Sequence, residues 1–339
     1  MCLYVKRAGK IENEERSIME RKRYLDVAKG IALILVIWGH AGMSIPGLGT
    51  AIIQFHMPLF FVVSGYLFKN THERMKDRIV KKAKRLLVPY FIFSVVYLSL
   101  GVIKGFLLHQ GVNVVELISL LFYLNGNVVR MGTPMWFLPV LFFTDIIYTL
   151  IKKYESKYAI IICVVLAVAA FEWMPILPFG LRISCIGLLF FMLGDCSKGL
   201  VNCFEGNRLL SIAVGTILLV FEFVSAQYNP GVNLYRYSFG VSWVRYILLA
   251  VIGAFGLIFM GGGIESNKIL EWISKQSLFI LSTHFIILML IDTIFNKLGV
   301  EWVNGAFITA LCLLVEALVI MGINKIQMLE CFRSKLGVM

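Results

Sequence analysis

Two apolar runs joined by a short turn decide how this chain folds. The first is YLDVAKGIALILVIWGH (residues 24–40) and the second is FHMPLFFVVSGYLF (residues 55–68). A helix that crosses the bilayer core needs about 20 mostly apolar residues, and each run supplies most of one. Because the turn between them, residues 44–50, is short, we predict an antiparallel helical hairpin.

The rest of the chain has the same apolar character. Of its 339 residues, 59% are hydrophobic and only 15% are charged, with a mean hydropathy of +0.83. A water-soluble domain is about one quarter charged, so this composition excludes a soluble domain. It also excludes a disordered chain, collagen and a disulfide-based scaffold. We therefore predict an all-α, polytopic membrane protein with one membrane domain.

About ten transmembrane helices are predicted, one for each apolar run. Residues 114–124 are a candidate for an additional re-entrant or interfacial segment. The expected organisation is a basic cytoplasmic segment at residues 1–26, a transmembrane domain at 27–323 and a cytoplasmic tail at 324–339. The predicted spans are residues 27–43, 51–68, 86–107, 134–151, 158–171, 181–194, 209–226, 243–262, 278–295 and 303–323.

The basic residues predict the orientation. The chain has 32 Lys and Arg against 20 Asp and Glu, a net charge of +12. If both termini are cytoplasmic, 25 of these 32 residues fall in cytoplasmic segments and 6 fall outside, as the positive-inside rule requires. We therefore predict a multi-pass protein of the cytoplasmic membrane with N-in and C-in topology. Its excess of basic residues then reflects this topology and not nucleic-acid binding, and membrane lipids are the expected partners.

Ionisable residues inside the predicted spans are candidates for chemistry, because burying them in lipid is costly. Asp26, Lys29 and His40 belong to the first span. Lys29 and His40 are eleven residues apart, so they share one helix face about 16 Å apart along the axis. His56, in the second span, is expected at the depth of His40, roughly 8 to 10 Å below the outer surface.

Two imidazoles at one depth suit proton transfer near neutral pH. The alternative is a pair of interfacial histidines bonded to backbone carbonyls. Two histidines without a nearby carboxylate do not indicate a metal, and none is predicted. His284, in the ninth span, is expected either to line a cavity shared with His40 and His56 or to make a structural hydrogen bond to a neighbouring helix.

A basic connection, KNTHERMKDRIVKKAKR (residues 69–85), precedes the third span. Arg78, Lys82 and Arg85 within it are candidates for gripping a phosphate-bearing molecule from the cytoplasm. An ordinary positive-inside loop explains the same run. On the outer side, the loop at residues 227–240, with Tyr235 and Arg236, has the composition of a sugar-stacking surface and also of an interfacial aromatic belt.

Several of these segments resemble acyltransferase family 3, the integral-membrane O-acyltransferases, and especially its single-domain members similar to fucose 4-O-acetylase. Besides the two opening runs, the resemblance includes KRLLVPYF, TPMWFL at residues 133–138 and SLFILSTHF at 277–285. The family's basic-x10-His signature is met by Lys29 and His40. Its R-x-x-R element appears as Lys82-Ala83-Lys84-Arg85, with lysine in the first position, which weakens the expectation of a bidentate phosphate contact there.

The resemblance implies transfer of an acyl group, usually acetyl, from cytoplasmic acetyl-CoA to a hydroxyl of a cell-surface or lipid-linked saccharide. His40 matches the histidine that the family uses as its proposed catalytic group. The expected catalytic residues are therefore His40, His56 and Asp26, and those that bind acetyl-CoA are Lys29, Arg78, Lys82, Arg85 and His284. The candidate substrate-binding residues are Gln54, Trp136, Tyr235 and Arg236.

Two other functions fit the same sequence. A transporter or flippase of a lipid-linked saccharide would also place charges within its spans and aromatic residues outside. A non-catalytic partner of a polysaccharide synthase would use the histidines for structure alone. Acetyl-CoA turnover separates the enzyme from both.

Overall fold

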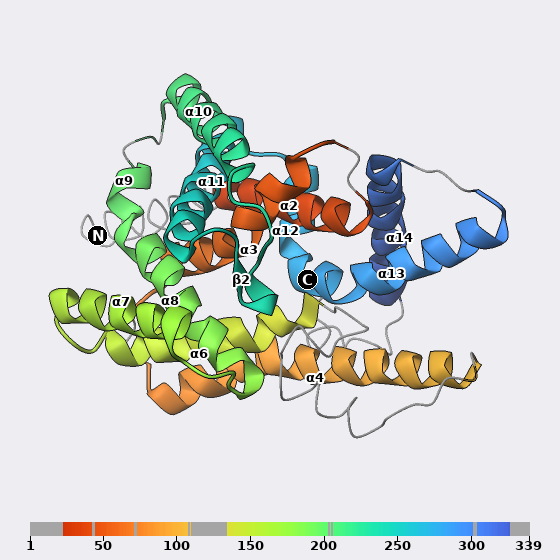
Figure 1. The fold of residues 1–339 in the computed structure, drawn as a ribbon, viewed down its shortest axis with the longest axis horizontal. Coiled ribbons are helices and arrows are strands. Elements are labelled where there is room, and N and C mark those ends of the chain that lie inside the picture. The colour runs from red at the N-terminus through yellow and green to blue at the C-terminus, as the bar shows by residue number, and fades with distance from the viewer. Residues whose placement is uncertain are drawn as a thin grey trace, which may run out of the picture.

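The computed structural model describes residues 23–42, 45–70, 73–107, 109, 134–202, 204, 206–300 and 304–325, which are mostly helical (Figure 1). The α-helices are α2 (Arg23–His40), α3 (Leu48–Tyr66), α4 (Met75–Leu107), α6 (Phe137–Ile151), α7 (Ser156–Glu172), α8 (Leu181–Cys196), α9 (Lys198–Asn202), α10 (Arg208–Ala226), α11 (Trp243–Ile264), α12 (Lys268–Lys275), α13 (Ser277–Lys297) and α14 (Gly305–Lys325). Short elements are the 3-10 helices η1 (Pro134–Trp136), η2 (Pro178–Gly180) and η3 (Leu234–Arg236) and the antiparallel pair β1 (Val232–Asn233) and β2 (Ser238–Phe239).

The prediction of an all-α polytopic membrane protein is confirmed for the described part of the chain. Every predicted span overlaps a helix, and seven helices are long and apolar enough to cross a membrane: α3, α4, α8 with η2, α10, α11, α13 and α14. α6 is a shorter apolar helix, α2 contains three charged residues, and α7 has 17 residues. The count of ten and the orientation stay predictions, and the candidate segment at 114–124 lies outside the described residues.

α4 begins eleven residues earlier than the predicted span, so the expectation that the connection stays non-helical up to residue 85 is wrong. The cytoplasmic location of this run stays a prediction. The basic run from Met75 onward is helical and continuous with the apolar part. Lys and Arg are good helix formers, and nothing in this run interrupts a helix before Pro89. This continuity places Arg78, Lys81, Lys82 and Arg85, spaced i, i+3, i+4 and i+7, on one helix face.

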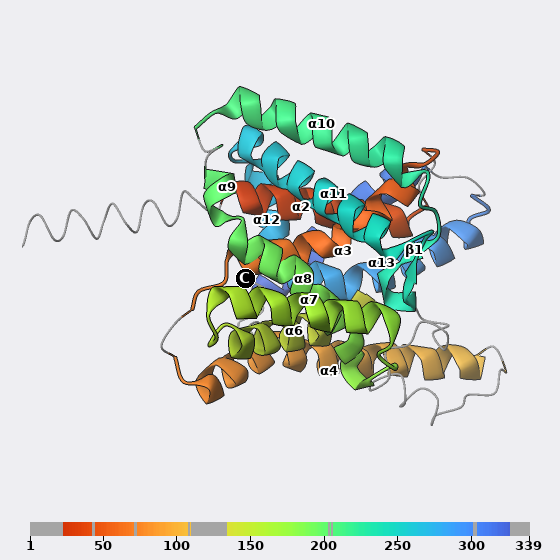
Figure 2. The same ribbon diagram turned by 60° about the vertical axis from the view of Figure 1, so that its left-hand side comes forward.

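α2 lies at the centre of the bundle. It packs against α3, α11, α12, α13 and α14, so half of its residues are buried. A second group, α6, α7 and α8, packs against α3 through α8, and α4 lies along α6 at the edge farthest from α10 (Figures 1 and 2). The N-terminal half of α4 therefore faces α2 across the space between the two groups.

Glycines allow α3 and α8 to touch backbone to backbone. A Cβ atom at Gly65 of α3 would overlap the carbonyl oxygen of Phe191, and one at Gly194 of α8 would overlap that of Val62. Small residues at such crossings are what helix packing in membranes favours. This close contact fixes the position of α3, which forms one wall of the cavity described next.

Candidate active site

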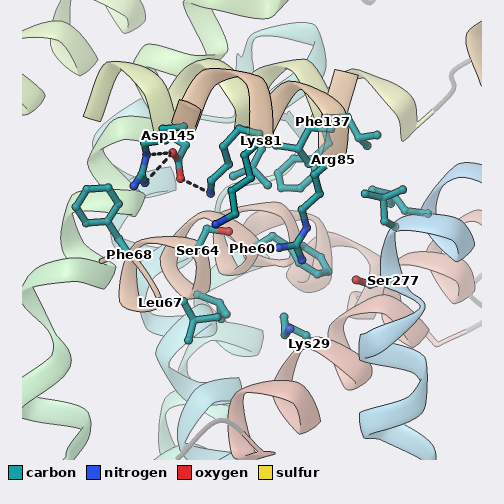
Figure 3. A pocket seen from close by; sticks show the side chains of 18 of the residues that line it. Lys29, Phe60, Ser64, Leu67, Phe68, Lys81, Arg85, Phe137, Asp145 and Ser277 are labelled. Carbon is teal, nitrogen blue, oxygen red and sulfur yellow. Dashed lines mark hydrogen bonds and ion pairs between the residues drawn. The ribbon is translucent and has the colours of Figure 1, made fainter. Parts of the chain in front are cut away.

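A cavity of about 550 Å³ lies between α2, α3, α4, α6 and α13 (Figure 3). Part of its wall is apolar and includes Leu33, Phe137 and Leu281. Another part is strongly basic. The charged residues that line it are Lys29, Lys69, Glu73, Arg78, Lys81, Lys82, Arg85 and Asp145. The structure thus brings together four of the residues predicted to bind acetyl-CoA, although they come from two helices far apart in the chain.

Two of the α4 cations are held by a buried carboxylate on α6. Asp145, which is 3% exposed, lies 2.9 Å from Arg78 through one oxygen and 2.6 Å from Lys82 through the other. The guanidinium of Arg78 also stacks over the ring of Phe68 at 4.7 Å and donates a hydrogen bond to the backbone oxygen of Lys69. Arg78 and Lys82 are therefore already engaged by protein groups.

The other two cations of this face are available to a ligand. Lys81 and Arg85 project from α4 into the cavity (Figure 3) and have no ion pair or hydrogen bond with any described residue. Arg85 is among the residues predicted from the sequence, whereas Lys81 is not. Its spacing, three residues after Arg78 and four before Arg85, would have identified it if the run had been interpreted as helical.

Lys29 reaches the cavity from α2, opposite α4 (Figure 3). Its ammonium lies 2.7 Å from Asp26, and the same oxygen of Asp26 accepts a hydrogen bond from Ser274 of α12 at 2.9 Å. Asp26 is fourteen residues from His40, which is about 21 Å along the helix. Within this structure Asp26 contacts Lys29 and not His40, so a catalytic role for Asp26 stays a prediction.

His40 is the last residue of α2 and lies beside His284 of α13. Their ring centroids are 5.5 Å apart, and the ring of Phe285 is 5.8 Å from His40. His40 is exposed, whereas His284 is fully buried. His284 was predicted with the residues that bind acetyl-CoA, but it does not line the cavity and instead neighbours the catalytic candidate.

Two of the three histidines are bonded to their own helices. Nδ1 of His56 donates to the backbone oxygen of Ile52 at 2.8 Å, and Nδ1 of His284 donates to that of Ile280 at 2.8 Å. This is the structural alternative considered for such histidines. His40 has no such bond to the described residues, although it is close enough to His56 and His284 for a charge on one ring to affect the others.

The cavity ends below the histidines. Leu281 lies one helical turn before His284, and Leu33 lies about two turns before His40. The apolar end of the cavity is therefore about 10 Å from His40 along α2. His40 itself is not part of the cavity wall. A donor bound among the basic residues would have to extend about 10 Å beyond this apolar end to reach the imidazole.

The candidate substrate residues gather around the connection between α10 and α11. Trp136 and Tyr235 stack with centroids 5.6 Å apart and planes at 29°. Burial raises the pKa of Tyr235 to about 12, so its phenol remains a neutral hydrogen-bonding group. Arg236 is exposed beside it. The structure thus places three of the four candidates in one region.

Gln54 has a different environment from the other substrate candidates. Its side chain is fully buried, donates to the backbone oxygen of Asn229 at 2.8 Å and accepts from the Asn229 amide at 3.2 Å. These contacts fasten the connection between α10 and α11 onto α3. Contact of Gln54 with substrate stays a prediction, since both ends of its amide are engaged by Asn229.

The fold and this site define a polytopic helical membrane protein with an internal basic cavity and a histidine near its apolar end. In the part of the chain that the structure describes, no group of three or more His, Cys, Asp or Glu side chains could hold a metal ion. A family model described as an acyltransferase domain, that of acyltransferase family 3, matches residues 22–321. The chain belongs to this family, which confirms the resemblance. Comparison with curated proteins and with solved structures found no match.

Proposed function

We propose that this membrane acyltransferase moves an acetyl group from cytoplasmic acetyl-CoA to a hydroxyl of a cell-surface or lipid-linked saccharide, in the cytoplasmic membrane. One observation carries the proposal: the basic cavity and His40 lie along the same helix, α2. Lys29 at the cavity and His40 at the helix end are about 16 Å apart, a distance suited to an extended pantetheine arm.

The cavity has the chemistry that acetyl-CoA requires. Lys81 and Arg85 supply cations for the phosphates, and arginine in particular can form paired hydrogen bonds with phosphate oxygens. The apolar part of the wall, which includes Leu33 and Phe137, suits the uncharged pantetheine chain. Arg78 and Lys82 would add to the positive potential while Asp145 holds them in place.

His40 would act as general base. It takes the proton of the saccharide hydroxyl as the oxygen attacks the thioester carbonyl, and a new C–O bond forms. When the tetrahedral intermediate collapses, the C–S bond breaks and the proton on His40 passes to the leaving thiolate, which gives the acetyl ester and free CoA. An acyl-histidine formed on His40 is the two-step version of the same transfer.

His56, the other histidine of the hairpin, is poorly placed to donate a hydrogen bond to the oxyanion of the tetrahedral intermediate. The Nδ1–H of His56 is directed to the backbone oxygen of Ile52, so a neutral His56 has no second N–H to offer. Trp136 and Tyr235, which stack on each other, would form an aromatic surface for the sugar ring.

The test is acetyl-CoA turnover by the purified protein together with analysis of the cell-surface glycan. Release of free CoA that depends on added saccharide, and loss of the mass of one acetyl group per unit in cells lacking the protein, are the expected results. Saccharide movement without CoA release would favour a transporter or flippase. Full surface acetylation in the variant His40→Ala would favour a non-catalytic partner of a polysaccharide synthase.

A further inference from the structure

The ring of His284 has a fixed tautomer. The backbone oxygen of Ile280, 2.8 Å from Nδ1, can only accept a hydrogen bond, so Nδ1 carries the hydrogen. In the neutral ring, Nε2 is then a lone-pair acceptor. This Nε2 is fully buried and has no hydrogen-bond partner among the described residues. A buried acceptor without a donor costs stability, and such groups commonly have a functional reason.

The helical turn that carries His284 is held in place from both sides. Tyr97 of α4 donates to the backbone oxygen of Ser282 at 2.9 Å. Thr283 lies 2.7 Å from a carboxylate oxygen of Glu316 on α14, and the thiol of Cys312 contacts the backbone oxygen of His284 at 3.8 Å. These contacts, with the Ile280 bond, fix the position of the ring. Nε2 then lies on the side of the ring that faces away from the backbone of α13.

His40 is the neighbour with a hydrogen to offer. Its ring centroid is 5.5 Å from that of His284, with the planes tilted by 40°, and it makes no hydrogen bond to the described residues. Among the described residues no carboxylate contacts His40. Asp26 is about 21 Å away along α2, and Glu316 is bonded to Thr283 through one oxygen while its other oxygen has no described partner. A catalytic histidine normally needs a group that fixes its tautomer.

We propose that His284 is the positioning partner of His40. Its Nε2 accepts a hydrogen bond from one ring N–H of His40, which leaves the opposite nitrogen of His40 unprotonated and directed at the saccharide hydroxyl. The bond requires a small rotation of the exposed His40 ring, and catalytic hydrogen bonds are often longer before substrate binds. This inference rests on the proposed acyl transfer and adds the group that orients its base.

Two substitutions that each replace the imidazole of His284 with an amide test the inference. In His284→Asn the amide overlies Nδ1, so the bond to Ile280 can persist while nothing occupies the Nε2 position. In His284→Gln the amide reaches the Nε2 position and its oxygen can accept from His40. We expect His284→Asn to lower kcat at least tenfold with the KM for acetyl-CoA within twofold of wild type, and His284→Gln to recover several-fold of the lost kcat.

Equal kcat values for the Asn and Gln variants would overturn the inference, as would a change confined to the KM for acetyl-CoA. His40→Ala separates this failure from failure of the proposed function. If His40→Ala abolishes transfer while the two His284 variants have equal kcat values, only the positioning role of His284 is contradicted. If His40→Ala retains full transfer, the proposed role of His40 is wrong, and the His284 inference fails with it.

A second measurement does not depend on turnover. Diethylpyrocarbonate acylates the unprotonated nitrogen of an imidazole, and peptide mass spectrometry follows the reaction at His40 alone. We expect His40 to react several-fold more slowly in His284→Asn than in wild type, with His284→Gln between them, because the oriented ring is the better nucleophile. Identical rates in the Asn and Gln variants would contradict the hydrogen bond between the two rings.

Discussion

Asp145 of α6 binds Arg78 and Lys82 of α4 at the same time, at 2.9 and 2.6 Å. The four cations on one face of α4 therefore divide into two that are held by the protein and two, Lys81 and Arg85, that face the cavity without a partner among the described residues. This division suggests different consequences for substitutions that remove the same charge.

Removing a cation that faces the cavity should weaken acetyl-CoA binding. We expect Lys81→Ala to lower the affinity about tenfold, since a charge-assisted hydrogen bond contributes about 1.5–3 kcal/mol. Lys84→Ala is the matched control, because Lys84 lies on the same helix, is exposed and does not line the cavity. Titration calorimetry of the purified protein measures both, and equal losses in the two variants would exclude a phosphate contact by Lys81.

Removing the carboxylate of Asp145, which holds Arg78, should lower the free energy of unfolding. Asp145→Asn leaves the buried Arg78 and the partly exposed Lys82 without their counter-charge, which we expect to cost about 3 kcal/mol. Asp77→Asn is the control, because Asp77 pairs with Arg74 at an exposed site where the contribution is about 0–1 kcal/mol. Thermal unfolding in detergent compares them. The same unfolding temperature for both variants would show that the Asp145 pairs contribute little.

The contact between α3 and α8 predicts a strong effect of one methyl group. Gly65→Ala would push against the backbone of Phe191, and we expect a loss of about 1–3 kcal/mol as the helices separate. Gly322→Ala in α14 meets no atom within 4 Å and should be neutral or stabilising by up to about 1 kcal/mol. The unfolding temperatures of both variants test this, and a stable Gly65→Ala protein would contradict the backbone contact.

The proposed general base makes a prediction for activity. His40→Ala should lower acetyl transfer by roughly 10²- to 10⁴-fold, the usual contribution of a positioned base, without changing acetyl-CoA affinity. His109→Ala controls for loss of a histidine, because His109 is exposed just beyond the end of α4. CoA release with saccharide present is the measurement. Equal activity in the two variants would remove His40 from the reaction.

The aromatic pair predicts an effect on the acceptor alone. Trp136→Ala should raise the KM for the saccharide about tenfold and leave the affinity for acetyl-CoA within twofold, since Trp136 stacks on Tyr235 and does not line the basic cavity. Trp173→Ala removes a tryptophan that is 76% exposed and should change neither the KM for the saccharide nor the affinity for acetyl-CoA. An unchanged saccharide KM in Trp136→Ala would place the acceptor elsewhere.

Local periodicity and composition were enough to predict much of this protein. Apolar runs give membrane helices wherever they occur, because a helix satisfies its own backbone hydrogen bonds in lipid. The shared face of Lys29 and His40 follows from helix geometry within a single segment. The family resemblance likewise rests on short motifs. The one local error, the start of α4, arose because a positive-inside loop and a basic helix have the same composition.

Only the tertiary structure decided which of these faces meet. The pairing of Asp145 with Arg78 and Lys82, and the placement of His284 beside His40, join helices that are distant in the chain. Periodicity determines which side of a helix a residue occupies but not which helix packs there. That choice depends on close packing across many side chains at once, as the α3–α8 contact through Gly65 and Gly194 demonstrates.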